Sequence, residues 1–115
     1  MAFEEFIIKG STIRDAAIGI ERSGKMNINT RCYHKYFKGF DYVVLFFDRE
    51  RRMIGLKPTK VPTKNTYALK LNKSLTLGSI NARTFLKHFE IDHKEAKKYQ
   101  ANWDDVNQFV VIDIS

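Results

Sequence analysis

Short apolar runs, separated by glycines and charged turns, dominate the pattern along the chain. Residues 17–21 and 25–28 are two short strand-like runs, and Gly24 between them can take the positive φ of a tight hairpin. The run Tyr42–Phe47 is apolar at every position, which is typical of a strand buried on both faces. Residues 52–57 follow a charged turn and read as the returning strand. The pattern therefore predicts a mainly β protein.

Two short helices are expected between these strand pairs. Asn29 and Asn81 are suitable N-caps, because an asparagine side chain accepts a hydrogen bond from an exposed backbone N–H. Each is followed by aromatic residues four positions apart, which share one helix face: Tyr33 with Phe37, and Phe85 with Phe89. Gly39 is the expected stop of the first helix. A further one- or two-turn helix is predicted to open at the capping-box pattern of residues 92–95.

The second half of the chain repeats the first. Residues 28–37 align with residues 80–89 without a gap and share Ile, Asn, Arg, Lys and Phe at five of ten positions. Chance identity is roughly one position in fifteen with ordinary residue usage. The offset between the halves grows from 52 to 56, which places a four-residue insertion around residues 92–98. Each half thus reads as a strand-strand-helix-strand-strand (ββαββ) unit.

One domain built from two units follows from this repeat. We predict an N-terminal arm at residues 1–15 and a single domain at 16–115, with repeat one at 16–58 and repeat two at 67–115. The linker at 59–66 follows from the two prolines of the segment 57–64, because proline cannot continue a central strand. A unit of about 50 residues leaves sheet edges open, so duplication lets the halves complete each other as a pseudo-dimer.

Composition limits the class of protein. The chain has 115 residues, 43% of them hydrophobic, which suits a folded domain rather than a disordered one. A single cysteine excludes a disulfide framework and fits a reducing cytoplasm. The longest apolar run has six residues and the first residues include acids, so neither a membrane span nor a signal peptide is expected. A cytoplasmic monomeric pseudo-dimer or homodimer is the prediction.

Positive charge is concentrated in the first repeat. The whole chain carries +7, and residues 16–63 alone carry ten Lys and Arg against four Asp and Glu. Such a concentration attracts polyanions, with a salt-sensitive affinity. Tyr33, Tyr36 and Tyr42 would add stacking if they are exposed, although they equally suit the core. The predicted nucleic-acid-binding residues are Arg22, Lys25, Arg31, Lys35, Lys38, Arg49, Arg51 and Arg52.

Enzyme signals are weak, so no catalytic residue, metal or cofactor is predicted. The three histidines have no metal-ligand spacing with each other or with Cys32. The acidic pair Asp104-Asp105 aligns with Asp48 in a turn, where aspartate supplies local hydrogen bonds. Cys32 aligns with Thr84, which indicates a structural position rather than a nucleophile.

Two resemblances bear on these units. The first repeat resembles the AbrB-type swapped-hairpin module, whose members include regulators, antitoxins and two-module MraZ-like proteins. The resemblance covers residues 24–29, the short helix that follows and the segment from Phe40 through Ile54-Gly-Leu-Lys-Pro58. The resemblance implies DNA binding, and Lys25 matches a basic position of the pattern. Tyr33 and His34 replace the family's Arg pair, which implies contacts mainly to phosphate. Residues 17–114 also resemble a group of short uncharacterised bacterial proteins.

Two hypotheses of function result. The first is a non-enzymatic, AbrB-like nucleic-acid-binding protein, a regulator or antitoxin, that uses a basic face of repeat one. The alternative is a protein-interaction module that kept the fold without DNA binding. Whether the bases of repeat one converge on one face discriminates between them.

Overall fold

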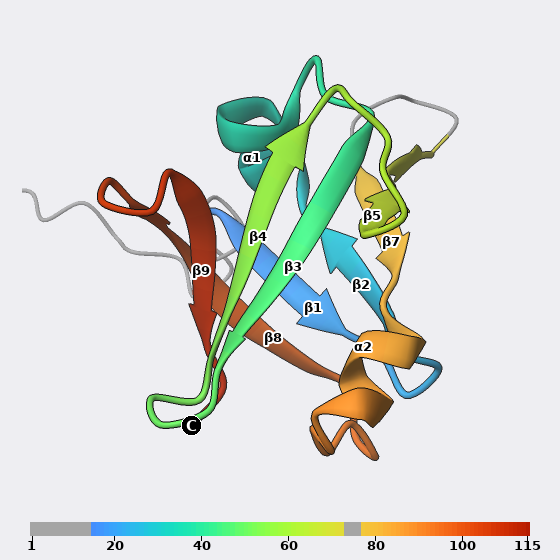
Figure 1. Ribbon diagram of the computed structural model, residues 1–115, viewed down its shortest axis with the longest axis vertical. Helices are drawn as coiled ribbons and strands as arrows, with labels where there is room; N and C mark the ends of the chain where they lie inside the picture. The colour runs from blue at the N-terminus through green and yellow to red at the C-terminus, as the bar shows by residue number, and fades with distance from the viewer. Residues whose placement is uncertain (1–14, 73–76) are drawn as a thin grey trace, which may run out of the picture.

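The protein is mainly β, as its hydrophobic pattern predicts, with a nearly closed barrel-shaped sheet and a few short helices (Figure 1). A computed structural model describes residues 15–72 and 77–115, so most of the predicted arm at 1–15 lies outside the described residues. The elements are β1 (Ala17–Ile20), β2 (Lys25–Ile28), α1 (Thr30–Cys32), the π-helical turn η2 (Tyr33–Phe37), β3 (Tyr42–Asp48), β4 (Met53–Thr59), β5 (Thr66–Ala68), β6 (Lys70–Leu71), β7 (Gly78–Asn81), α2 (Arg83–His88), β8 (Lys97–Asp104) and β9 (Phe109–Asp113).

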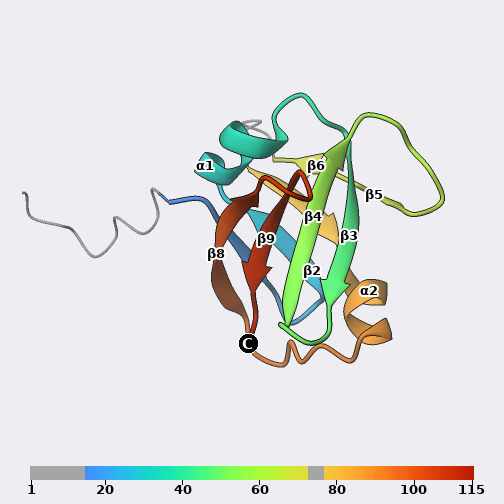
Figure 2. The same ribbon diagram turned by 60° about the vertical axis from the view of Figure 1, so that its left-hand side comes forward.

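Within the described residues, all nine strands belong to one antiparallel sheet in the order β5-β3-β4-β9-β8-β1-β2-β7-β6. The sheet turns a corner within β8, because Lys97–Gln100 pairs with β1 whereas Ala101–Asp104 pairs with β9. The two edge strands come together at Leu69, the only residue between β5 and β6. The Leu69 N–H donates to the carbonyl oxygen of Asp41 at 2.9 Å. These two corners curl the sheet into the barrel seen in Figure 2.

Local sequence explains the first hairpin and the first helix. Gly24 has φ +91 in the β1–β2 turn, which confirms its predicted conformation. Gly39, the predicted stop of the first helix, has φ +89 two residues after the end of η2. Asn29 caps α1, since its Oδ1 accepts from the Cys32 N–H at 2.9 Å. Asn81 does not cap α2 in the same way, because the N-cap is Ala82 and makes no side-chain cap hydrogen bond.

The core fills the barrel between the two helices, which lie at opposite ends of it (Figures 1 and 2). Inward-facing side chains alternate along the strands, and each helical segment adds a fully buried residue, Phe37 from η2 and Leu86 from α2. The other largest fully buried side chains are Ile18, Met26, Ile28, Ile54, Leu56, Ile80, Ile112, Val43, Val110 and Cys32. Within residues 15–72 and 77–115, no helix has the length and hydropathy needed to cross a bilayer.

Three expectations about the strands and loops are wrong. Pro58 lies inside β4 and pairs with Val43, because β4 has no β9 neighbour beyond Leu56 and proline is tolerated on such an edge. Residues 92–96 form no helix, since the Asp92 carboxylate accepts from the Lys94 N–H two residues on and β8 begins at Lys97. The outer face of β3 is not covered, and Phe46 remains 43% exposed.

Candidate nucleic-acid interface

Three segments meet at one end of the barrel, which we call the α2 end: the β1–β2 turn, helix α2 and the β3–β4 turn (Figures 1 and 2). The β1–β2 turn is fixed on the start of α2, because the Ala82 N–H donates to the Gly24 carbonyl at 3.0 Å. A Cβ at Gly24 would lie 2.7 Å from the Arg83 Cα, so only glycine permits this approach. Residues some 60 positions apart in the chain thereby become neighbours.

Aromatic rings join the β3–β4 turn to α2. Phe47 of β3 packs against Phe85 and Phe89, with ring centroids at 6.4 and 5.1 Å. Two arginines of the turn then lie on these rings: the Arg49 Cζ is 5.0 Å from the Phe89 centroid and the Arg52 Cζ is 5.2 Å from the Phe47 centroid. Cation–π contacts restrict these side chains while their N–H donors stay available.

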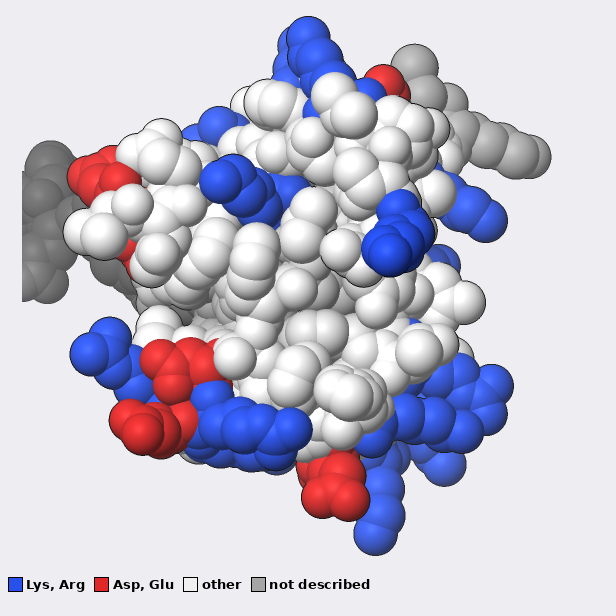
Figure 3. Space-filling model, viewed as in Figure 1, with Lys and Arg blue, Asp and Glu red and all other residues white. Residues whose placement is uncertain are grey.

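Lysine and arginine side chains gather at the α2 end, and Figure 3 shows the densest group over α2 and the β1–β2 turn. All of them are exposed except Arg52, which is half-buried. In the described part of the chain, the only ion pair within 4.0 Å is the exposed contact between Arg51 and Asp48. Most of this positive charge is therefore available to an external anion. The α2-end bases are Arg22, Lys25, Arg49, Arg51, Arg52, Arg83 and Lys87.

The remaining predicted bases lie at the opposite end, which we call the η2 end. Arg31, Lys35 and Lys38 are exposed on α1 and η2 or just after them. The expectation of one basic face within repeat one is therefore wrong. Helix α1 and η2 sit at the other end of the barrel from the β1–β2 and β3–β4 turns (Figure 1). The predicted set is thereby divided into five bases at the α2 end and three at the η2 end.

The predicted stacking tyrosines are placed unevenly. Tyr33 is buried, with 6% of its surface exposed, so it belongs to the core. Tyr36 is half-buried, and its ring stacks on Trp103 with a centroid distance of 5.5 Å and an interplanar angle of 8°. The Lys35 ammonium lies 5.3 Å from the Tyr36 ring. Trp103 therefore covers one face of the Tyr36 ring, and Trp103 itself remains 38% exposed.

Arg83 and Lys87 were not among the predicted site residues. They belong to the second half of the chain, whose positive charge is masked in the sequence by its own acids. The contact between Gly24 and Arg83 brings them beside the first half. One signal was available in the sequence: α2 carries both bases four positions apart, on one face of a helix.

Cys32 and Asp104, which were considered for catalysis, are a buried core residue and a turn residue in the structure. Cys32 is fully buried, and burial raises the pKa of its thiol to about 12, so the thiol stays protonated near neutral pH. The Asp104 Oδ1 accepts from the N–H groups of Val106 and Asn107 at 2.9 and 3.1 Å, which confirms the predicted turn chemistry. Across the described ranges, no three His, Cys, Asp or Glu side chains are grouped closely enough to hold a metal ion.

Three comparisons with known proteins identified no relative of this chain. A scan against protein-family models, a search of curated proteins and a search of solved structures each found no match to this chain.

Proposed function

We propose that the chain is a non-enzymatic nucleic-acid-binding protein, of the kind used as an AbrB-like regulator or antitoxin. The observation that carries the proposal is the meeting of seven bases, from three separated segments, at the α2 end. Among the described residues, only one of these bases, Arg51, forms an ion pair within 4.0 Å. A nucleic-acid backbone is the polyanion that such a surface suits best.

Contacts at this end would be made mainly to phosphate. Arg49 and Arg52 lie on aromatic rings, so their planar guanidinium groups are held with donors free to bind a phosphate in bidentate fashion. The helix at this end has six residues and is capped without a side chain, so it supplies little for reading base edges in a groove. Weak sequence preference and strong salt dependence are therefore expected.

Strand registers support the idea that two ββαββ units form a pseudo-dimer. In the β2–β7 pair, Asn27 faces Ser79, and these residues are equivalent at the sequence offset of 52. In the β4–β9 pair, Gly55 faces Val111, which are equivalent at the offset of 56. A twofold axis relating the halves would pass through both pairs, because residues on such an axis pair with their own equivalents.

A salt titration of duplex binding tests the proposal with two matched variants. Lys25→Gln with Lys87→Gln removes two charges from the α2 end, and Arg31→Gln with Lys38→Gln removes two charges from the η2 end. We expect the wild type to bind duplex DNA at about 50 mM salt and to lose affinity as salt rises. The α2-end pair should lower the affinity about tenfold and reduce the salt slope by about 2, since each phosphate contact contributes about 0.9 to the slope.

The η2-end pair is the control and should leave the affinity within about threefold of the wild type. Its charges lie at the opposite end of the barrel, and exposed charges separated by more than the Debye length, about 10 Å at 0.1 M salt, are largely screened from each other. Absence of binding at low salt, binding without a salt slope, or equal effects of the two pairs would each count against the α2 end as the interface.

A protein-interaction module is the second candidate, favoured by the apolar outer face of β3 and β9. The Phe46 ring is 43% exposed and lies 5.2 Å from the Phe109 ring. The Phe109 ring covers Gly55, where a Cβ would come within 2.8 Å of it. Figure 3 shows a central region without charged side chains on this side of the molecule.

A partner bound on that face would be retained by the wild type and by the double variant Lys25→Glu with Arg31→Glu, and lost by Phe46→Asp. Affinity capture with quantification of the retained partner makes this comparison. If the charge variant loses the partner and Phe46→Asp keeps it, the outer face is not the contact surface.

A further inference from the structure

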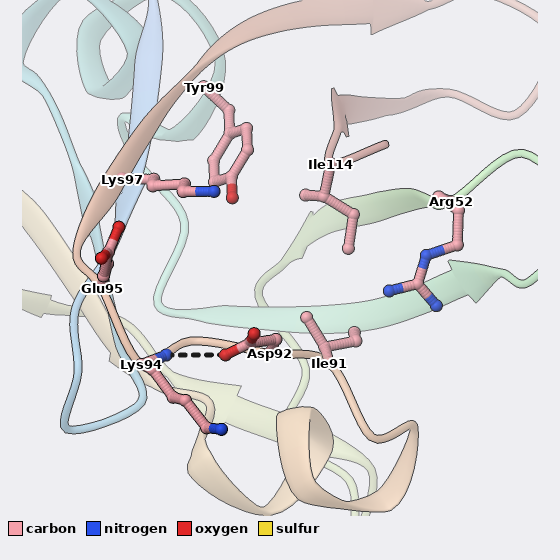
Figure 4. Close-up of a pocket in the computed structure, with 8 residues that line it drawn as sticks. All are labelled: Arg52, Ile91, Asp92, Lys94, Glu95, Lys97, Tyr99 and Ile114. Atoms are coloured by element: carbon pink, nitrogen blue, oxygen red, sulfur yellow. Dashed lines mark hydrogen bonds between the residues drawn. The ribbon is translucent and has the colours of Figure 1, made fainter.

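A pocket of about 400 Å³ opens at the α2 end, beside the bases discussed above. Its walls come from the residue before β4, the segment that follows α2, the first residues of β8 and the residue after β9 (Figure 4). This volume lies in the range of small-molecule sites. The residues that line it are Arg52, Ile91, Asp92, Lys94, Glu95, Lys97, Tyr99 and Ile114.

The polar groups reach the pocket from two opposite sides. Figure 4 shows the Arg52 guanidinium on one side and the Lys97 ammonium with the Tyr99 hydroxyl on the other, separated by Ile91 and Ile114. Ile91 is buried and Ile114 is half-buried, so the floor between the polar groups is aliphatic. A ligand that fills this space would need charge at one end and an apolar or planar body in the middle.

Arg52 is held in place by its surroundings. Its Cζ lies 5.2 Å from the centre of the Phe47 ring, and its carbonyl oxygen accepts from the Ile114 N–H at 2.9 Å. Its backbone has φ 57, a conformation that favours glycine or asparagine over arginine. A pre-positioned guanidinium recognises a phosphate in two-point contact without first losing its side-chain freedom.

The charges in the pocket select among anions. Three bases and two carboxylates line it, and none of the three bases forms an ion pair within 4.0 Å among the described residues. The Asp92 Oδ1 accepts from the Lys94 N–H at 2.9 Å, which keeps that carboxylate beside the opening. Carboxylates repel the successive phosphates of a continuous backbone, but they accept hydrogen bonds from amino and hydroxyl groups of a base and sugar.

We propose that this pocket binds a nucleoside monophosphate group, with its phosphate on Arg52 and its nucleoside over Ile91 and Ile114 toward Tyr99 and Lys97. The phosphate monoester can come from a free nucleotide or from the 5′ end of a strand. The strand-end form rests on the proposed nucleic-acid binding, whereas the free-nucleotide form does not. In both forms the pocket adds recognition of one terminal phosphate, which backbone contacts do not provide.

Calorimetric titration with adenosine 5′-monophosphate, adenosine and inorganic phosphate tests the pocket. We expect the monophosphate to bind at least tenfold more tightly than either fragment. Arg52→Gln should lower its affinity at least tenfold, and the fold should persist because Gln108 holds the same conformation, φ 59, in another turn. Lys70→Gln removes one charge from an exposed position on β6 away from the pocket, and should change the affinity less than twofold.

Equal binding of the monophosphate and inorganic phosphate, or unchanged binding by a folded Arg52→Gln protein, would overturn the proposal. Two single strands of one sequence, with a 5′-phosphate and with a 5′-hydroxyl, separate the sources by competition with the monophosphate. Stronger competition by the phosphorylated strand assigns the pocket to strand ends, and equal weak competition assigns it to free nucleotides. Failure of duplex binding in the same preparation would count against the proposed function and the strand-end form, and it would leave the free-nucleotide form standing.

Discussion

Two hairpin turns at opposite ends of the barrel have the same backbone and different chemistry. In the β3–β4 turn, the Asp48 Oδ1 accepts from the N–H groups of Glu50 and Arg51, both at 3.0 Å. In the β8–β9 turn, the Asp104 Oδ1 accepts from the N–H groups two and three residues on, at 2.9 and 3.1 Å. The residue before the returning strand has a positive φ in each turn, 57 at Arg52 and 59 at Gln108.

The two turns differ in the four side chains between the aspartate and the returning strand. The first turn carries the sequence Arg-Glu-Arg-Arg at residues 49–52, and the second carries Asp-Val-Asn-Gln at residues 105–108. Because one backbone accommodates both, the arginines are not required by the turn itself. Their chemistry is therefore free to serve binding at the α2 end.

The largest expected effect is on the free energy of unfolding, and it compares one glycine at the α2 end with one at the η2 end. Gly24 and Gly39 both have φ near +90, but a Cβ at Gly24 meets the Arg83 backbone at 2.7 Å whereas a Cβ at Gly39 meets nothing within 4 Å. Gly24→Ala should destabilise the protein by about 3 kcal/mol, from strain and overpacking together. Gly39→Ala should cost about 1 kcal/mol, from the left-handed conformation alone. Urea unfolding measures both, and equal losses would contradict the close packing of the β1–β2 turn on α2.

A turn exchange tests the difference in chemistry directly. Replacing residues 49–52 by Asp-Val-Asn-Gln keeps Asp48 and the positive-φ position, so the stability should change by less than about 1 kcal/mol. The exchange lowers the local charge by three, and duplex affinity at about 50 mM salt should fall at least tenfold, or about 1.4 kcal/mol. Mobility shift with the exchanged protein checks this. Unchanged affinity in a stably folded exchange variant would remove the β3–β4 turn from the interface.

The smallest expected effect is on the pH dependence of stability, and it concerns the β8–β9 turn. Hydrogen bonds from Asn107, first through its side chain and then through its backbone N–H, lower the pKa of Asp104 below its ordinary 3.8. A lowered folded-state pKa stabilises the folded protein at pH above the unfolded value, and this contribution is lost as pH falls through the folded value. Asp104→Ala should thus melt below the wild type at neutral pH, with the difference shrinking below about pH 4. A difference that is constant down to about pH 2 would contradict this role.

Local features were predictable from the sequence because they depend on neighbouring residues. The positive φ of Gly24, the cap at Asn29 and the turn chemistry of Asp104 each arise within a few positions. The short helix expected at residues 92–95 failed for the same local reason, because the Asp92 side chain bonds two residues on instead of three. A one-turn helix also lacks the length to offset its nucleation cost.

The candidate site was only half predictable. Charge counting identified Arg22, Lys25 and the arginines of residues 49–52, but it also included three bases that lie at the other end. It missed Arg83 and Lys87, since a count along the chain cannot show which distant segments share a surface. The covering of β3 was likewise misjudged, because an apolar run does not reveal whether another layer packs on its outer face.

The sequence by itself determined the mainly β character, the two helices and the cap at Asn29, since propensity, glycine conformations and side-chain hydrogen bonds act over short separations. Only the tertiary structure decided which bases lie together on one surface. The barrel closes at Leu69 and turns within β8, and this curvature carries the helix of the first half to one end and the turns of that half to the other. Long-range strand pairing set that arrangement, and through it the surface on which bases from distant segments of the chain gather.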